Sequence, residues 1–142
     1  MTDRSALLLS VRPRFAQAIL AGTKTVEIRR RPIRSGSGTP VVLYASTPTM
    51  AVVGTARLVD VEALTLHRAW RRYRHTLGVS WPEFTEYLDG VDVAYLLRLD
   101  DVKELERPIL LHTLRARRPF QPPQSFRYIN SGDPKQLRDL VS

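Results

Sequence analysis

Short apolar segments with strand-like patterns, separated by proline and glycine, constrain this fold more than any other feature. Residues 6–11 and 41–46 form mainly apolar runs, and residues 91–99 alternate with a period of two. A further strand is predicted at 52–61. None of these runs approaches the ~18 apolar residues that a membrane-spanning helix needs. The 142 residues suit one domain, so we predict a single domain, 1–142, of the α+β class whose strands dominate the core.

Capping signals place short helices between these strands. Pro13 stands in the first turn of a helix that Gly22 ends, and Ser80 with Glu83 forms a capping box for another. Residues 65–77 are amphipathic, with an apolar stripe opposite arginine side chains. Further short helical pieces are predicted at 111–116 and 134–141. An exposed, mobile loop is predicted at 30–38, and a charged bend after residue 99.

The charge of the chain is uneven and strongly basic. The formal net charge is +8, with 22 basic and 14 acidic residues. Residues 1–59 hold nine basic and two acidic side chains, 60–111 hold seven and ten, and 112–142 hold six and two. Both ends are therefore basic and the middle is not. Such an asymmetry favours a polyanionic partner, most often a nucleic acid.

The sequence lacks the residues and motifs that several kinds of functional site require. There is no cysteine, and the three histidines show no metal-ligand spacing. Neither a phosphate loop nor a dinucleotide-binding glycine turn is present. We therefore expect no metal and no cofactor. The N-terminus leads directly into a strand without a signal-peptide pattern, which predicts a cytoplasmic location and no membrane partner.

Four ordered segments carry a family resemblance. Two are Gly22-Thr-Lys-Thr-Val-Glu-Ile-Arg29 and Pro123-Gln-Ser-Phe-Arg-Tyr-Ile129; the others are Leu9–Pro13 and Tyr44–Pro48. Together they resemble the ASCH domain family of the PUA-like superfamily over nearly the whole chain. The resemblance implies a partly open β-barrel of five to six strands with flanking helices. It also implies a cleft beside the barrel that takes a nucleic acid or a nucleotide.

The resemblance further implies a set of cleft residues. Strand alternation places Glu27 and Arg29 on one face, where the carboxylate can orient the guanidinium, and Lys24 on the other face, near the cleft rim. Arg30 and Arg31 are expected to contact backbone phosphates. Trp81 has two interpretations, a packing residue or a base-stacking one. The predicted nucleic-acid-binding residues are Arg12, Lys24, Glu27, Arg29, Arg30, Arg31, Ser46, Arg127 and Tyr128.

Three functional classes stay open at this point. The leading hypothesis is a nucleic-acid-binding module for RNA or DNA; a protein-interaction domain for an acidic partner is a further class. The alternative is a hydrolase that uses Lys24 and Glu27, because one ASCH branch removes the acetyl group from acetylated cytidine and ribonuclease activity is associated with the family. That branch uses a lysine, a threonine three residues later and a glutamate. Lys24 matches the lysine, but Glu27 occupies the threonine position. The third role is open among Glu62, Glu83 and Glu86.

Overall fold

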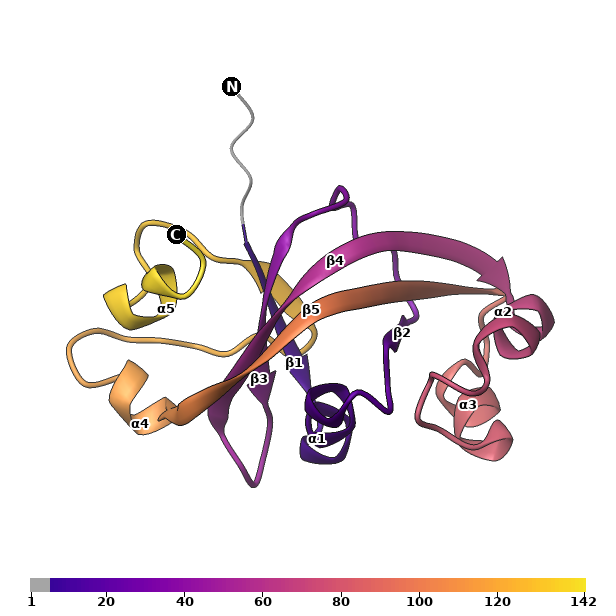
Figure 1. Ribbon diagram of the computed structural model, residues 1–142, viewed down its shortest axis with the longest axis horizontal. Helices are drawn as coiled ribbons and strands as arrows, with labels where there is room; N and C mark the ends of the chain where they lie inside the picture. Colours follow the sequence, from indigo (N-terminus) through magenta and orange to yellow (C-terminus); the bar gives the residue numbers. More distant parts are fainter. Residues whose placement is uncertain (1–5) are drawn as a thin grey trace.

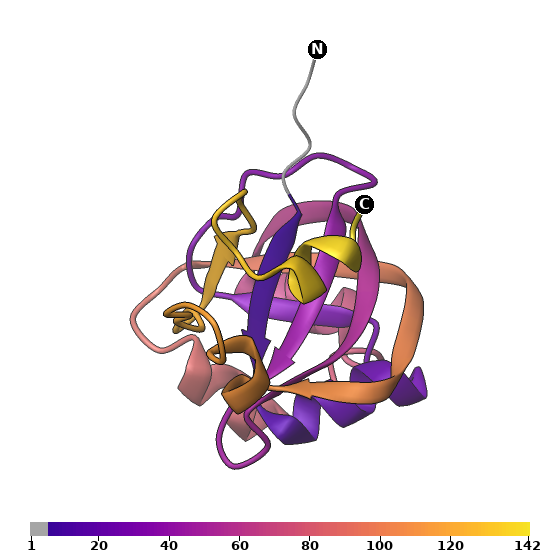
Figure 2. The same cartoon turned by 90° about the vertical axis from the view of Figure 1, so that its left-hand side faces the viewer.

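The computed structural model describes residues 6–142 and shows one six-stranded sheet that curls around its core (Figures 1 and 2). The order across the sheet is β2-β5-β4-β3-β1-β6. Only β1 and β3 pair in parallel; the other neighbours are antiparallel. The predicted partly open barrel is confirmed as a half-barrel. The strands are β1 Leu7–Val11, β2 Val26–Arg29, β3 Pro40–Ala45, β4 Ala51–Thr65, β5 Val93–Leu110 and β6 Phe126–Tyr128.

Strands β4 and β5 are much longer than the sequence pattern predicted. They pair antiparallel from Thr65 and Val93 to Ala51 and Leu110. The charged segment predicted as a bend after residue 99 does not end the strand, because β5 continues beyond it to Leu110 as the ladder partner of β4. It is an irregularity within β5, where the register shifts and Asp101 has a left-handed backbone, φ 48°. Three register shifts allow the pair to bend. Most side chains of β5 beyond residue 99 are exposed or half-exposed, so this half of the strand lacks the apolar alternation of its first half.

Five short helices flank the sheet. They are α1 Pro13–Ala21, α2 Leu66–Tyr73, α3 Trp81–Tyr87, α4 Leu111–Leu114 and α5 Lys135–Asp139. Gly22 ends α1 with a left-handed backbone, φ 83°, as the sequence predicted. The capping box of α3 is confirmed, since Ser80 and Glu83 bond reciprocally. Helix α2 ends earlier than predicted, because Thr76 turns back to bond the carbonyl of Tyr73 through both its N–H and its hydroxyl.

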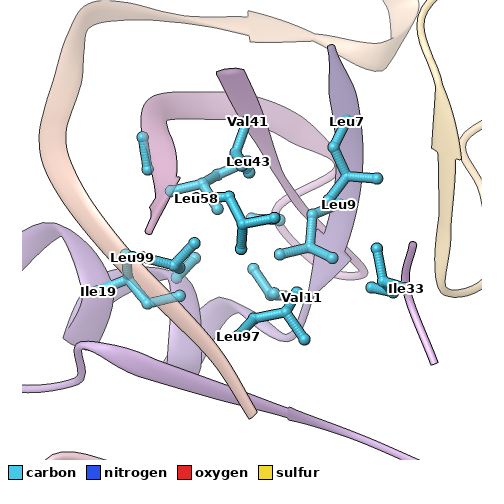
Figure 3. Close-up of a cluster of buried hydrophobic side chains, with 13 residues drawn as sticks. Leu7, Leu9, Val11, Ile19, Ile33, Val41, Leu43, Leu58, Leu97 and Leu99 are labelled. Carbon is cyan, nitrogen blue, oxygen red and sulfur yellow. The ribbon is translucent and has the colours of Figure 1, made fainter. Parts of the chain in front are cut away.

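The apolar runs are buried on both faces of the sheet, and this explains their continuity. Leu7, Leu9 and Leu43 meet inside the curl (Figure 3). Leu8, on the other face of β1, packs in a second cluster with residues of α4 and α5. Ile33 lies in the first cluster and exposes 3% of its surface. Most of the 30–38 loop is exposed, as predicted, but Ile33 anchors it to the core.

Gly54 lies where β4 bends, close to β5 and α1. Because little space is left there, we expect one added methyl group to lower the stability of the fold. A Cβ there would lie 2.6 Å from Leu20 Cδ2 and 2.7 Å from the carbonyl oxygen of Lys103. We expect Gly54→Ala to lower the free energy of unfolding by about 1–3 kcal/mol, measured by urea denaturation. Gly36→Ala is the control, since a Cβ at Gly36 meets nothing within 4 Å. Equal urea midpoints for the two variants would contradict this account.

Candidate nucleic-acid interface

A cleft of about 890 Å³ opens beside the sheet, where β1, β2 and β3 meet α1, α3 and α4. Figure 1 shows these three helices along one edge of the molecule, below the sheet. Ser10 and Tyr44 enter the cleft from β1 and β3, and Ser46 from the turn after β3. The parallel pairing of β1 with β3 places Ser10 opposite Tyr44, so two distant segments supply neighbouring polar groups. The volume is within the range of pockets that hold a small ligand or a single nucleotide.

Three charged side chains form a buried chain along the cleft. The Glu27 carboxylate lies between two cations, with Oε1 3.3 Å from Lys24 Nζ and Oε2 2.7 Å from Arg29 Nη2. Lys24, Glu27 and Arg29 expose only 1%, 7% and 8% of their surfaces. Charges so far from water are costly unless they are paired. Glu27 therefore compensates two buried cations at once.

Lys24 lies on the side of Glu27, and the prediction that it would lie on the opposite face of the strand was wrong. Strand β2 begins only at Val26, so the period-two alternation does not reach back to residue 24. The backbone N–H of Lys24 instead donates to the carbonyl of Ala18, within the turn that follows α1. This turn directs the Lys24 side chain toward Glu27. Lys24 therefore lies on the cleft floor and not at its rim.

The surroundings of Lys24 make its ammonium, which is paired with Glu27, easier to deprotonate than that of an ordinary lysine. Burial lowers the pKa of the ammonium, and the nearby Glu27 carboxylate opposes that effect without cancelling it. Lys24 Nζ donates to the carbonyl oxygen of Leu77 at 2.5 Å. In the neutral amine, two N–H groups can serve Leu77 and Glu27, and the lone pair is left for a proton. A lysine in such surroundings can act as a base near neutral pH.

Arg29 uses its guanidinium mainly within the protein. Its Nη2 also donates to the carbonyl oxygen of Ser10 at 2.9 Å, and its Nη1 donates to Ser125 Oγ at 2.8 Å. Arg29 Nε is buried and has no hydrogen-bond partner among the described residues. Glu27 does orient this arginine, as the sequence predicted. The Arg29 guanidinium, however, joins β2 to β1 and to the 123–126 segment, and it is not directed toward solvent.

Two tyrosines add hydroxyl groups to the cleft. Tyr44 exposes 3% of its surface, and burial raises its pKa, against a smaller opposite effect of Arg115. Tyr87, at the end of α3, also has a raised pKa because of burial. Both phenols therefore stay protonated over the neutral range, and each can donate a hydrogen bond to a ligand.

Arginines from two helices stand at the more exposed part of the cleft. Arg12 is the N-cap residue of α1, and Arg115 is the C-cap residue of α4. Arg12 forms no ion pair with the described residues, and Arg115 bonds only neutral groups, the carbonyl of Phe120 and the side chain of Gln121. Both guanidinium charges thus remain available to an anion. Arg14 differs, since it pairs with Glu83 at 2.5 Å.

The structure separates the three glutamates that the sequence left open. Glu83 and Glu86 line the cleft from α3, whereas Glu62 lies at the far end of β4, beside Tyr73 and Arg72. The Ser80 backbone N–H and the Arg14 side chain lower the pKa of Glu83 to about 2. Glu83 therefore stays a carboxylate that caps α3 and holds Arg14.

Not all predicted cleft residues reach the cleft. It includes Arg12, Lys24, Glu27, Arg29 and Ser46 as expected. The expectation that the tail would line it was wrong for two residues: Arg127 pairs with Asp133, and the Tyr128 hydroxyl bonds Ser35. Arg30 bonds the carbonyls of Tyr87 and Asp89 beside the cleft, and Arg31 is exposed outside the lining. Whether these four residues bind nucleic acid stays a prediction.

Sequence reasoning missed some cleft residues. Tyr44 belongs to a segment that carried the family resemblance, yet its place in an apolar run gave it the pattern of a core residue. Arg115 and Gln121 come from a region without periodicity, so no local signal marked them. Trp81 exposes 38% of its surface and packs against Trp70, with ring centroids 5.2 Å apart. This contact favours the packing interpretation.

Residues 6–142 contain neither a cluster of metal-ligand side chains nor a helix that could span a membrane. No group of three or more histidine, aspartate or glutamate side chains is arranged there to hold a metal ion. None of the helices in that range is long and apolar enough to cross a membrane.

The chain matches one family model and resembles several known proteins in sequence and in structure. The model of a family described as a domain of unknown function, DUF365, matches residues 5–115. An "ASCH domain-containing ribonuclease" of Zymomonas mobilis is 33% identical over 141 residues, which cover 99% of this chain and 95% of the relative. The crystal structure of ASCH from Zymomonas mobilis matches with a TM-score of 0.87 and 34% identity, over 99% of this chain and 98% of that one. A hypothetical protein from Leishmania major, at 18% identity and a TM-score of 0.65, shares the fold over 98% of this chain and 95% of its own.

Proposed function

Because this chain belongs to the ASCH domain family, we propose that it binds RNA in the cleft and cleaves it there. One observation carries the proposal: the buried chain of Lys24, Glu27 and Arg29 lies in a cleft that also presents Arg12 and Arg115. A buried lysine with a lowered pKa beside unpaired cations is typical of a reactive site for an anionic substrate. The ribonuclease name of the Zymomonas mobilis relative supports RNA as that substrate.

Binding comes from the arginines. Arg12 and Arg115 contact phosphate oxygens, and the net charge of +8 attracts the strand over longer distances. The cleft between them takes one nucleotide, whose sugar and base reach the polar groups of Ser10, Tyr44 and Ser46. Phosphate contacts position the strand but carry no sequence information. We therefore expect broad sequence tolerance.

Cleavage uses the 2′-hydroxyl of the bound nucleotide. The neutral Lys24 amine takes the proton of that hydroxyl, and O2′ then bonds to the adjacent phosphorus. The bond between phosphorus and O5′ breaks, and the departing oxygen takes a proton from the Tyr44 hydroxyl. Arginine charge stabilises the phosphorane that forms in between. The products are a 2′,3′-cyclic phosphate and a 5′-hydroxyl, which mass spectrometry distinguishes from the ends left by direct attack of water.

The test compares binding and cleavage of one labelled RNA decamer by wild-type protein and by Arg12→Ala. We expect the variant to bind roughly three- to tenfold more weakly and to lose about 0.7 from the slope of log affinity against log salt between ~50 and ~200 mM. Arg71→Ala is the matched control, because Arg71 is an exposed arginine on α2, outside the cleft. Affinity independent of salt, or equal losses in both variants, would contradict binding in the cleft.

A second candidate, hydrolysis of an acetylated nucleoside, is favoured by one observation. Glu86 lines the same cleft as Lys24 and, unlike Glu83, is not held by Arg14, so it is available for the third role of that branch. Glu27 in place of the threonine argues against it, since a carboxylate held between two cations cannot replace a hydroxyl. Incubation with N4-acetylcytidine separates the two candidates: acetate release without RNA cleavage would favour the second.

A further inference from the structure

A second, more open hollow adjoins the cleft on the side of α4. It measures about 680 Å³ and is lined by Arg115, Arg117, Arg118, Pro119, Phe120 and Gln121. Arg115 and Gln121 also line the cleft, so the two hollows share a wall. A strand that fills the cleft would therefore reach this hollow by passing Arg115 and Gln121.

The charge around the cleft is strongly polarised. Residues 107–132, which include α4 and the loop after it, contain five arginines and no acidic residue. The opposite wall is α3, where Glu83 is paired with Arg14 and Glu86 has no ion pair with the described residues, and Asp89 follows it. Phosphates are therefore attracted more strongly on the α4 side than on the α3 side. The polarity selects one direction for a polyanion that leaves the cleft.

The loop arginines keep their charge available. Arg115 donates to the carbonyl of Phe120 and to Gln121, and Arg118 donates to the carbonyl of Gly132. These partners are neutral, so they orient both guanidinium groups without compensating them. Arg117 is exposed and forms no ion pair or side-chain hydrogen bond with the described residues. Arg127 differs, because Asp133 compensates its charge.

We infer that the hollow at 115–121, here called the arginine groove, holds the phosphates of the RNA strand beyond the nucleotide in the cleft. This inference rests on the proposed function and deepens it, because it makes an RNA chain, and not a single nucleoside, the ligand. Pro119, within this loop, restricts its backbone, which lowers the entropy lost when the strand binds. The groove reads phosphate positions and adds affinity without sequence preference.

The test measures fluorescence anisotropy with a labelled 2′-O-methyl RNA dinucleotide and decamer, which have no free 2′-hydroxyl for cleavage. We expect Arg117→Ala to weaken binding of the decamer roughly three- to tenfold, to reduce its salt slope by about 0.7, and to leave the dinucleotide unchanged. Arg71→Ala, the matched control on α2, should leave both affinities within about twofold of wild type. Thermal unfolding of each variant checks that the fold is intact.

The outcomes separate the groove from the cleft. If Arg12→Ala weakens binding of both oligonucleotides and Arg117→Ala weakens binding of neither, the role proposed for the arginine groove is wrong. Binding in the cleft would still be supported. If Arg117→Ala and Arg71→Ala weaken the decamer equally, general charge attraction explains the result and the groove is again wrong. If the wild-type protein binds neither oligonucleotide, the proposed function fails and the groove fails with it.

Discussion

Replacement of Lys24 by methionine is expected to reduce RNA cleavage roughly 10²- to 10⁴-fold while the protein stays folded. Methionine keeps most of the volume of the lysine stem, so no cavity opens beside Gly78. Gly78 packs closely on this stem, since a Cβ added to it would lie 3.3 Å from the Lys24 side chain. The substitution removes a buried ammonium and leaves Glu27 paired with Arg29 at 2.7 Å. We therefore expect the free energy of unfolding to fall by less than about 1 kcal/mol, or to rise.

The pH profile distinguishes a base from a structural lysine. If the neutral amine takes the proton, the wild-type rate rises as the pH increases toward the lowered pKa of Lys24 and levels off above it. The residual rate of Lys24→Met should lack this rise. A variant that unfolds at the wild-type temperature and cleaves at the wild-type rate would remove Lys24 from the mechanism. Cleavage is measured by gel analysis of a labelled RNA across pH values at constant ionic strength.

Replacement of Glu27 by alanine is expected to have the largest effect on stability. It leaves two buried cations, Lys24 and Arg29, without their shared carboxylate, at 1% and 8% exposure. Removal of one partner from a buried ion pair typically costs about 3–5 kcal/mol. We expect a loss of that size in the free energy of unfolding, measured by urea denaturation. Glu86→Ala, an exposed cleft glutamate on α3, is the control and should lose less than about 1 kcal/mol.

A double variant tests the physical cause of that loss. If uncompensated charge destabilises Glu27→Ala, then adding Lys24→Met should restore part of the lost stability, because one of the two buried cations is gone. The interaction energy from the double-mutant cycle should have a magnitude of about 1–3 kcal/mol. Simple additivity of the two substitutions would show that Glu27 stabilises the fold through packing and not through charge.

Local signals accounted for much of the fold. The end of α1 at Gly22 and the capping box of α3 depend on contacts within a few residues, so sequence spacing was enough to predict them. The long half of β5 could not be predicted in this way. Its residues beyond 99 are held by the β4 ladder, and most are exposed, so they carry no apolar period. The same limit applied to Ile33, whose burial depends on core residues distant in the chain.

The sequence by itself determined the strand-rich fold, the family resemblance, the basic ends and the presence of Lys24, Glu27 and Arg29 in one short segment. Only the tertiary structure decided how these groups are used. It directs Lys24 to the side of Glu27, joins Arg29 to Ser10 and Ser125, and brings Tyr44 and Arg115 to one cleft. The physical reason is that burial and compensation of charge depend on neighbours far apart along the chain. No local pattern records those neighbours.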